Sequence, residues 1–334
     1  PPSASLLTSP NQTTTLAMAT VAVWKISNLS SSSHEVIAQN PEATRGSVAL
    51  VTCREALGID YDMPLLLEAV RATGIAVDEV CWDDESIDWS TYDQVVIRST
   101  WDYHRRYDEF MQWVRAVSAV STISNSVDVI TWNTDKHYLA EVAAIGLPIV
   151  PTIFIEPGQD DWLSSARELL AKGDVVVKPA ISAGSNDTER HSNFDAAQKH
   201  IAELLLAQRS VMLQPYMADV DVQSETGLVF INGKFSHAFA KGPLLAQAKN
   251  MSGGLYAEEE IGVRQPTAEQ LLIGERAVKW LLSRFGKLLY ARVDLLPTAH
   301  GPVIIELELA EPSLYLLLHP SAASELAHAL LNLS

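Results

Sequence analysis

The sequence predicts a mixed α/β (α+β) protein whose first domain is a small parallel α/β unit. Short apolar strands alternate with amphipathic helices between residues 48 and 120, which is the order of a parallel sheet. Asn232-Gly233 separates two later strand-like runs and predicts a two-residue hairpin, so the second half contains antiparallel strands. The 334 residues, of which 47% are hydrophobic, suffice for two or three packed domains.

The first domain extends to about residue 130 and comprises three strands and two helices. The strands are predicted at 48–52, 77–82 and 94–98, and the helices at 63–73 and 109–120. Gly74 ends the first helix. In the second helix the spacing of Phe110, Val114 and Val117 gives one apolar face.

The second half begins with a helix over 135–144, capped by Asn133 or Thr134 and ended by Gly146. Further strands are predicted at 149–155, 175–178, 211–214, 225–232, 234–241, 289–296 and 303–309, and further helices at 194–207 and 268–285. Residues 242–260 contain three glycines without a clear period and are predicted to form a mobile loop.

Bulk properties exclude some classes of function. The formal charge of −17 argues against binding nucleic acid or an anionic membrane, and no apolar run approaches the roughly 20 residues that span a bilayer. Cys53 and Cys81 lie in apolar strand-like runs, which predicts buried free thiols and a reducing cytoplasm. Residues 1–46, rich in Ser, Thr, Asn and Pro, are interpreted as a disordered or non-native extension.

A carboxylate pattern in the last two predicted strands is the strongest chemical signal. Alternate side chains of a strand share a face, so Arg292 points with Asp294, and Glu306 points with Glu308. If the strands pair through the turn near 298–302, three carboxylates converge on one guanidinium, a set of oxygen ligands that suits Mg²⁺. Taken alone, a solvated hairpin face with an ordinary ion pair explains this pattern equally well.

A lysine ends a predicted buried strand. Lys178 precedes the loop Ser182-Ala183-Gly184-Ser185, whose small residues let backbone N–H groups approach phosphate oxygens. By itself this pattern is more often an ordinary strand-end lysine, and Lys136 and Lys241 join it only if the fold brings them together. Leu213 to Met217 runs from a strand into a proline-fixed linker that is either a domain connector or a surface for a purine.

An aromatic segment follows the third strand of the first domain. Ligands of α/β sheets gather at the carboxyl ends of strands. Arg98 is therefore a candidate to bind a substrate carboxylate, with Trp101 and Tyr103 as walls of the pocket. The alternative is that these aromatic side chains only pack a domain interface.

The order of these features resembles the ATP-grasp superfamily, whose D-alanine–D-alanine ligases end in similar Arg-x-Asp and Glu-x-Asn arrangements. The features are, in chain order, Lys136, Lys178 with the loop to Ser185, Gln214 to Met217, Glu225, Lys241, Arg292-Val293-Asp294 and Glu306-Leu307-Glu308. The resemblance implies an ATP-grasp fold preceded by a parallel α/β pre-ATP-grasp domain. It divides the chain into the extension at 1–46, the pre-ATP-grasp domain at 47–131, a lid subdomain at 132–215 and a carboxyl-terminal subdomain at 216–334.

The resemblance also implies a role for each site residue. ATP would be held by Lys136, Lys178, Ser182, Gly184, Ser185, Gln214, Tyr216, Met217 and Glu225. One or two Mg²⁺ ions, or Mn²⁺ in their place, would be held by Asp294, Glu306 and Glu308, the last of which stands where the family usually has asparagine. Arg292 and Lys241 would be catalytic and would stabilise developing negative charge. Ser313 would join Arg98, Trp101 and Tyr103 on the substrate side.

Four stretches are similar to the O-ureido-D-serine cyclo-ligases of D-cycloserine biosynthesis. They are 59–64, 96–101, 235–238 and 306–314. This resemblance implies an ADP-forming carbon–nitrogen ligase that acts through an acyl phosphate on a small carboxylate or amino acid, with a ureido amino acid as a candidate for ring closure. It implies a cytoplasmic monomer or homodimer. The alternative is a non-catalytic ATP-binding sensor or partner-binding module.

Overall fold

The computed structural model describes residues 46–243, 245 and 260–331, all of which belong to one compact unit of the chain. The predicted amino-terminal extension lies outside the described residues except for Gly46. The predicted loop at 242–260 lies outside them except for its two ends and Leu245.

The amino-terminal sheet is parallel, as predicted, with the strand order β2-β1-β3-β4. Its strands are β1 (Ser47–Thr52), β2 (Ala76–Cys81), β3 (Gln94–Ser99) and β4 (Thr122–Ser124), and its helices are α1 (Met63–Ala72), α2 (Tyr107–Ser118) and α3 (Val127–Asn133). Leu66 of α1 packs in a core with Leu50 of β1. Phe110 of α2 packs with Val51 in a separate core on the other face. Because both faces are covered, every residue of β3 is buried.

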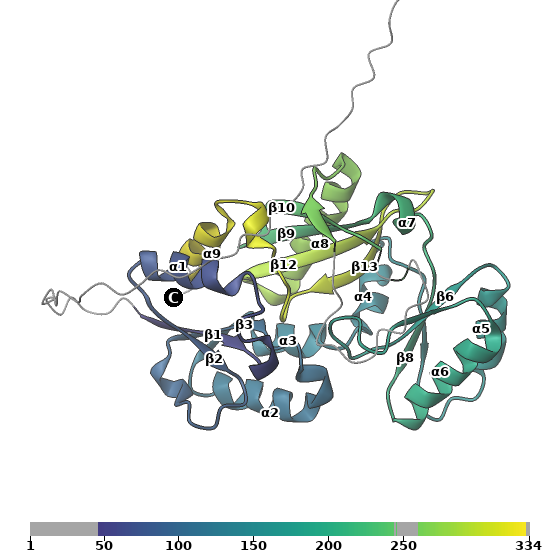
Figure 1. Ribbon diagram of the computed structural model, residues 1–334, viewed down its shortest axis with the longest axis horizontal. Coiled ribbons are helices and arrows are strands. Elements are labelled where there is room, and N and C mark those ends of the chain that lie inside the picture. Colours follow the sequence, from purple (N-terminus) through teal and green to yellow (C-terminus); the bar gives the residue numbers. More distant parts are fainter. Residues whose placement is uncertain (1–45, 244, 246–259, 332–334) are drawn as a thin grey trace, which may run out of the picture. The chain divides into compact units, whose positions relative to one another are not determined.

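The carboxyl-terminal sheet is antiparallel, with the strand order β11-β10-β9-β12-β13 (Figure 1). Its strands are β9 (Glu225–Ile231), β10 (Lys234–Lys241), β11 (Ile261–Val263), β12 (Tyr290–Leu296) and β13 (Val303–Glu308). The predicted hairpin is confirmed, since Asn232 and Gly233 have φ angles of 48° and 73°, as in a type I′ turn. Helix α8 (Ala268–Phe285) begins and ends where predicted and covers one face, with Gly274 against Leu228.

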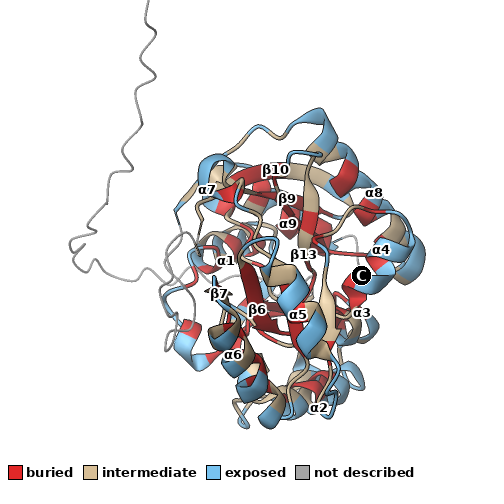
Figure 2. Cartoon of the chain, turned by 90° about the vertical axis from the view of Figure 1, so that its right-hand side faces the viewer, coloured by how far each residue is buried: buried red, intermediate tan, exposed pale blue. Residues whose placement is uncertain are grey.

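The third sheet is also antiparallel, with the order β5-β8-β6-β7. It contains β5 (Ile153–Ile155), β6 (Val175–Pro179), β7 (Glu189–His191) and β8 (Val211–Pro215), and α5 (Trp162–Leu170) and α6 (Phe194–Leu206) lie side by side on one face (Figure 1). Val175 and Val177 of β6 pack against these helices. The period of two therefore places Lys178 on the opposite face. Figure 2 shows that β6 is buried while the outer sides of the two helices are exposed.

The start of the helix predicted over 135–144 is wrong. Helix α4 spans Tyr138–Ala144, and Asn133, which was predicted to cap it, is instead the last residue of α3. The Asn133 side chain bridges to the end of β13: its Nδ2 donates to the carbonyl of Leu307 at 2.7 Å and its Oδ1 accepts from the N–H of Leu309 at 2.7 Å. A side chain committed to a strand so distant in the sequence cannot act as a local cap.

Other differences concern short elements. The strand predicted at 149–155 is reduced to β5, and Ile149 forms only an isolated bridge with Ile304. The elements not predicted are β4, β7, α3, α5, α7 (Val220–Gln223), α9 (Ala322–Leu331) and the 3-10 helices η1 (Arg54–Ala56), η2 (Trp89–Thr91), η3 (Tyr103–Arg105) and η4 (Leu316–Leu318). The prediction of free, buried cysteines is confirmed for Cys53 and Cys81.

Candidate active site

The face of the carboxyl-terminal sheet opposite α8 carries the predicted acids, and α9 covers another part of the same face. Strands β12 and β13 pair so that Arg292 lies opposite Glu308 and Asp294 lies opposite Glu306. Directly paired residues project to the same face of a sheet. The predicted convergence of Arg292, Asp294, Glu306 and Glu308 on one face of the sheet is therefore confirmed. The alternative of a solvated hairpin face does not fit, because Arg292 and Asp294 are 4% and 2% exposed.

Arg292 is bound by its neighbours through all three of its nitrogen atoms. Its Nε and Nη2 donate to the carboxylate of Asp294 at 2.7–3.1 Å, and Nη2 also donates to Glu308. Its Nη1 donates to the carbonyl of Ser313 at 2.9 Å. The guanidinium therefore organises two of the acids and fixes the segment that follows β13.

A glycine on β9 makes room beneath this cluster. Gly227 lies opposite Asp294 on one side and opposite Phe239 of β10 on the other. A Cβ atom at Gly227 would lie 2.1 Å from the Phe239 ring. That ring also packs 4.3 Å from the ring of Tyr315 and 5.7 Å from the Arg292 guanidinium. Because Gly227 has no side chain, the Phe239 ring can approach β9 and pack near the Arg292 guanidinium.

Lys136 connects the acids to the predicted phosphate loop. Its Nζ lies 3.0 Å from Glu306 and donates to the carbonyl of Ser182 at 2.7 Å. Burial alone would raise the pKa of Glu306, but Lys136 and Lys178 outweigh it and lower that pKa. Both lysines therefore act electrostatically on the same carboxylate, as the predicted site requires.

Lys178 is a buried cation without a partner among the residues that the structure describes. Its side chain is 7% exposed, and none of the described residues forms a hydrogen bond or ion pair with it. The pKa of Lys178 is lowered to about 8, chiefly by burial, while Glu306 opposes this effect and Lys136 adds to it. Glu225 and Lys241 act on it as well, and these two residues pair across β9 and β10. The cost of burying an unpaired ammonium predicts an anion at this position.

Negative charge is in excess around Glu308, in contrast to the positive charge at Lys178. Burial raises the pKa of Glu308 well above its ordinary value, Arg292 opposes this, and Asp294, Glu306 and Glu311 add to the rise. The donor set of three carboxylates suits Mg²⁺ or Mn²⁺, which prefer oxygen ligands. The crowding of acids beside an unpartnered lysine therefore fits a metal–polyphosphate complex.

The small-residue loop has the expected compact backbone. Gly184 and Ser185 have φ angles of 60° and 59°, in the left-handed region that glycine adopts readily and serine seldom does. Ser182 is 5% exposed, and its carbonyl accepts from Lys136, which fixes the loop beside the lysines.

The predicted adenine segment presents one acceptor and one donor without protein partners. The N–H of Tyr216 donates to Asp174 at 2.8 Å, and the carbonyl of Met217 accepts from Val220 at 3.1 Å. Among the described residues nothing bonds the carbonyl of Tyr216 or the N–H of Met217. Gln214 is 1% exposed and donates to Thr152 at 2.8 Å, so its side chain supports the strand instead of facing outward.

The predicted substrate residues contact two loops of the site. Arg98 is 1% exposed; its Nη2 donates to the carbonyl of Pro312 at 2.9 Å, while its buried Nη1 has no partner among the described residues. The indole of Trp101 donates to the carbonyl of Glu311 at 3.1 Å. The hydroxyl of Tyr103 lies 3.4 Å from the carbonyl of Ser182. These side chains join the amino-terminal sheet to the loops around the acids.

Sequence reasoning left three residues of this region without a role. Asp62 binds backbone N–H groups that follow β13, Asn133 binds the end of β13, and Glu311 lies beside Lys136 and Glu306. Asp62 and Glu311 do fall within stretches that resemble the cyclo-ligases, and that was the available signal. Their contacts join segments too distant for any local period to reveal.

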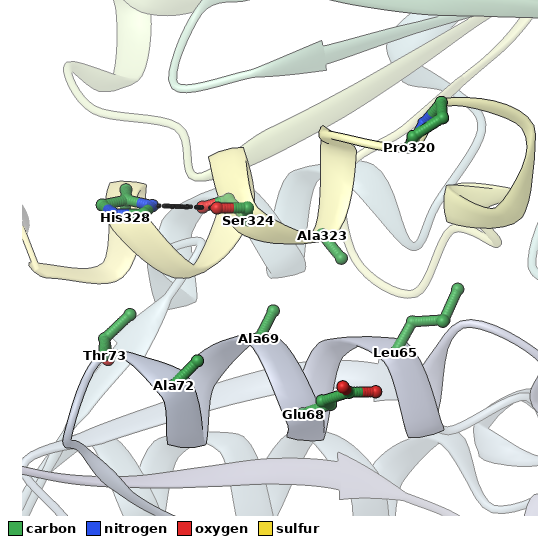
Figure 3. A pocket seen from close by; sticks show the side chains of 9 residues that line it. All are labelled: Leu65, Glu68, Ala69, Ala72, Thr73, Pro320, Ala323, Ser324 and His328. Carbon is green, nitrogen blue, oxygen red and sulfur yellow. Dashed lines mark hydrogen bonds between the residues drawn. The ribbon is translucent and has the colours of Figure 1, made fainter.

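Two further features lie away from the acids. A groove of about 300 Å³ separates α1 from α9 and is lined largely by apolar or small side chains such as Leu65, Ala69 and Ala323 (Figure 3). In the third sheet His191 and His200 are hydrogen bonded at 3.0 Å beside Glu189. Neither feature contains the lysines and acids described above. In the part of the chain that the structure describes, no helix is long and apolar enough to cross a membrane.

Solved structures of ATP-grasp enzymes share this fold. The D-alanine–D-alanine ligase from Bacillus anthracis complexed with ATP has a TM-score of 0.61 at 14% identity, covering 86% of this chain and 96% of that one. The ATP-grasp ligase PsnB has a TM-score of 0.59 at 18% identity, covering 87% and 100%. The predicted ATP-grasp fold is confirmed, and together with the relationship described next it makes the chain an ADP-forming ligase that forms carbon–nitrogen bonds.

A nearer similarity identifies the family. Residues 48–125 match the model of the D-cycloserine synthetase DcsG amino-terminal domain. The chain is 38% identical to the cycloserine biosynthesis protein DcsG of Streptomyces lavendulae over 298 residues, which are 85% of this chain and 98% of that protein. The crystal structure of D-cycloserine synthetase DcsG has a TM-score of 0.78 at 36% identity, covering 86% and 99%. The chain belongs to the DcsG family of ATP-grasp ligases, so the alternative of a non-catalytic ATP-binding module is not retained.

Proposed function

We propose that the chain closes a ring within a ureido amino acid, with O-ureido-D-serine as the substrate and an acyl phosphate as the intermediate. The name of the relative, D-cycloserine synthetase, supports the substrate and the ring. The observation that carries the chemistry is Lys178, a buried cation beside the acids of β13 that has no partner in the described part of the chain. A γ-phosphate is an anion that would satisfy this lysine in an ADP-forming ligase.

The nucleotide contacts are assigned to the residues that surround Lys178 and to the segment after β8. Lys136 and Lys178 bind phosphate oxygens beneath the loop from Ser182 to Ser185. The carbonyl of Tyr216 and the N–H of Met217 bind the adenine edge, and Glu225 binds the ribose. Asp294, Glu306 and Glu308 hold one or two Mg²⁺ ions, which neutralise phosphate charge when bound.

The reaction has two displacements. A carboxylate oxygen of the substrate attacks the γ-phosphorus, and the bond to ADP breaks. A nitrogen of the same molecule then attacks the acyl carbon, a carbon–nitrogen bond forms, and phosphate leaves with the electron pair of the acyl–oxygen bond, while the proton of the attacking nitrogen passes to phosphate or solvent. Arg292 and Lys241 stabilise the developing oxyanion, an effect worth on the order of 10²–10³ in rate for one preorganised donor.

The substrate lies on the side of the amino-terminal sheet. Trp101 and Tyr103 form walls of its pocket, and Ser313 presents a hydroxyl from the segment that Arg292 fixes. Arg98 is kept as a substrate residue through Nη1, because Nη2 is committed to Pro312; since Nη1 is buried, the side chains that cover it must move when the carboxylate binds. A cytoplasmic location and a monomeric or dimeric state stay predictions.

The test is turnover of O-ureido-D-serine with ATP and Mg²⁺. We expect one ADP and one phosphate per cyclic product, and hydroxylamine should divert the acyl phosphate to a hydroxamate. Glu85→Gln, at an exposed residue of the amino-terminal domain, serves as the control variant with unchanged turnover. ADP formation that ignores the amino acid, or a phosphorylated product without a new carbon–nitrogen bond, would overturn the proposal.

A further inference from the structure

The segment that follows β13 is fixed by side chains from distant parts of the chain. Four successive carbonyl groups each accept a hydrogen bond from a different side chain. The pairs are Tyr290 to Ala310 at 2.9 Å, Trp101 to Glu311 at 3.1 Å, Arg98 to Pro312 at 2.9 Å and Arg292 to Ser313 at 2.9 Å. The backbone at 310–313 is therefore held on every residue.

The next three residues are held through their N–H groups. The carboxylate of Asp62, which is 3% exposed, accepts from Leu314, Tyr315 and Leu316 at 2.6, 3.0 and 2.7 Å. Tyr315 has a φ angle of 50°, an uncommon conformation that the surrounding contacts maintain. So many directed contacts on one short segment are typical of a preorganised site, in which supporting residues fix the side chains that act.

Glu311 lies in the middle of this segment and has a carboxylate without a cationic partner. Among the described residues no side chain forms a hydrogen bond or ion pair with this carboxylate, which accepts only from the backbone N–H of Glu311 itself. Burial raises its pKa to about 7, with Glu306 adding to the rise and Lys136 opposing it. Lys136 is already bound to Glu306 and Ser182, so it does not satisfy this carboxylate. The arrangement leaves a half-buried acid in need of a cation.

Glu311 borders the substrate side of the site as well as the phosphate side, where Lys136 and Glu306 influence the pKa of its carboxylate. Its carbonyl binds Trp101, and its carboxylate adds more than any other charged group to the rise that burial causes in the pKa of Tyr103. Both aromatic residues belong to the amino-terminal sheet, on the side where the substrate is proposed to lie. A cation that reaches Glu311 there is a nitrogen of the substrate.

We propose that Glu311 binds the α-ammonium group of the amino-acid substrate through a charge-assisted hydrogen bond. This inference rests on the proposed function and names the part of the substrate that the site selects. The rigid backbone at 310–316 fixes the distance between this ammonium site and the acids of β13. The distance between the ammonium group and the carboxylate of the substrate therefore decides whether that carboxylate reaches the γ-phosphate. The segment thus selects α-amino acids over other small carboxylates.

The test compares O-ureido-D-serine with its desamino analogue, 3-(ureidooxy)propanoate, on the wild-type enzyme and on Glu311→Gln. Loss of a hydrogen bond between charged groups predicts a KM for O-ureido-D-serine that rises roughly 10- to 100-fold. The KM for ATP and the Mg²⁺ concentration for half-maximal turnover stay within about twofold. The inhibition constant of the desamino analogue stays unchanged, which a merely structural role for Glu311 would not produce.

Controls separate the outcomes. Glu85→Gln makes the same chemical change at an exposed position and leaves all constants unchanged. If Glu311→Gln does not fold, Glu311→Asp keeps the charge but withdraws it by one methylene group, and the same comparison applies. Equal weakening of both compounds, or a changed Mg²⁺ requirement with an unchanged KM for O-ureido-D-serine, overturns the inference. Failure of the wild-type enzyme to release ADP with O-ureido-D-serine overturns the proposed function instead.

Discussion

Nζ of Lys136 lies 3.0 Å from a carboxylate oxygen of Glu306 and joins the turn before α4 to β13. The lysine side chain is 5% exposed, whereas that of Glu306 is 26% exposed, so part of the acid faces solvent. Because the same Nζ also binds the carbonyl of Ser182, one residue sets the distance between the acids and the phosphate loop. A change in the Lys136–Glu306 ion pair should therefore also move the loop at Ser182.

Replacement of Lys136 by methionine tests whether this lysine is needed to join the acids to the phosphate loop. Lys136→Met keeps the length of the side chain but leaves Glu306 without its cation, so we expect kcat/KM for ATP to fall on the order of 10²–10³-fold. Steady-state ADP release measures the effect. Lys172→Met is the matched control, since that lysine is 69% exposed and pairs only with Glu168. A loss of less than threefold would contradict the role assigned to Lys136.

Replacement of Lys178 by methionine is expected to stabilise the protein while it abolishes turnover. The pKa of Lys178 is lowered to about 8 from 10.5, so the folded state pays for a charged ammonium at pH 7. Between about pH 8 and 10.5 the unfolded chain binds the extra proton, and the stability of the wild type rises with pH. Lys178→Met should therefore be more stable at pH 7 by on the order of 1–3 kcal/mol, with a smaller difference at pH 10.

Urea unfolding at both pH values measures this difference in the free energy of unfolding. Titrations common to both proteins cancel, which isolates Lys178. Lys199→Met is the control, because that side chain is 77% exposed and its replacement should give no pH-dependent difference. ATP should stabilise the wild type more than Lys178→Met. A variant that is less stable at pH 7 would show that the lysine has a partner in solution.

The acids of β12 and β13 were predictable because strand geometry is local. Arg292 and Asp294 share a face through the period of two, as do Glu306 and Glu308, and a short turn brings the strands together. The hairpin at Asn232 was predictable for the same reason. Elements of three residues, such as β4 and β7, are too short to show a period.

Contacts between distant segments were not predictable from one sequence. Asn133 has the residue type of a helix cap, and only the proximity of β13 shows that its side chain binds Leu307 and Leu309 instead. Asp62 lies before α1, and nothing near it in the sequence indicates Leu314. Glu311 stands next to a proline in a loop, where its burial depends on the amino-terminal sheet.

Replacement of Asp62 by alanine tests the support of the segment at 310–316. Asp62→Ala leaves three N–H groups without their acceptor, two of them in the buried residues Leu314 and Leu316. Each unsatisfied buried group costs about 1–3 kcal/mol, so we expect a large loss in the free energy of unfolding and a raised KM for the amino acid. Urea unfolding and ADP release measure these effects, with the exposed Asp160→Ala as control. An unchanged free energy of unfolding would show that Asp62 does not stabilise the segment at 310–316.

Replacement of Gly227 by alanine tests the packing of the Phe239 ring near Arg292. The added Cβ would lie 2.1 Å from the Phe239 ring, so the ring must move from beneath Arg292. Overpacking of this kind costs about 1–3 kcal/mol and should lower kcat. Gly262→Ala on β11 is the control, because a Cβ there meets nothing within 4 Å. The double variant with Phe239→Leu should recover part of the lost stability; strict additivity would argue against the clash.

Replacement of Glu308 by asparagine tests why this chain carries a third acid where the ATP-grasp family usually has an amide. Burial and the neighbouring acids raise the pKa of Glu308, so its charge disfavours the metal-free fold. Glu308→Asn removes that repulsion but also one anionic ligand, and hard divalent cations bind less tightly as the ligand charge falls. We therefore expect a metal-free protein that is more stable at pH 7, and a Mg²⁺ concentration for half-maximal turnover that rises roughly 3- to 10-fold, with kcat largely kept. Glu85→Asn should alter neither quantity, and an unchanged Mg²⁺ requirement in Glu308→Asn would place the metal on Asp294 and Glu306 alone.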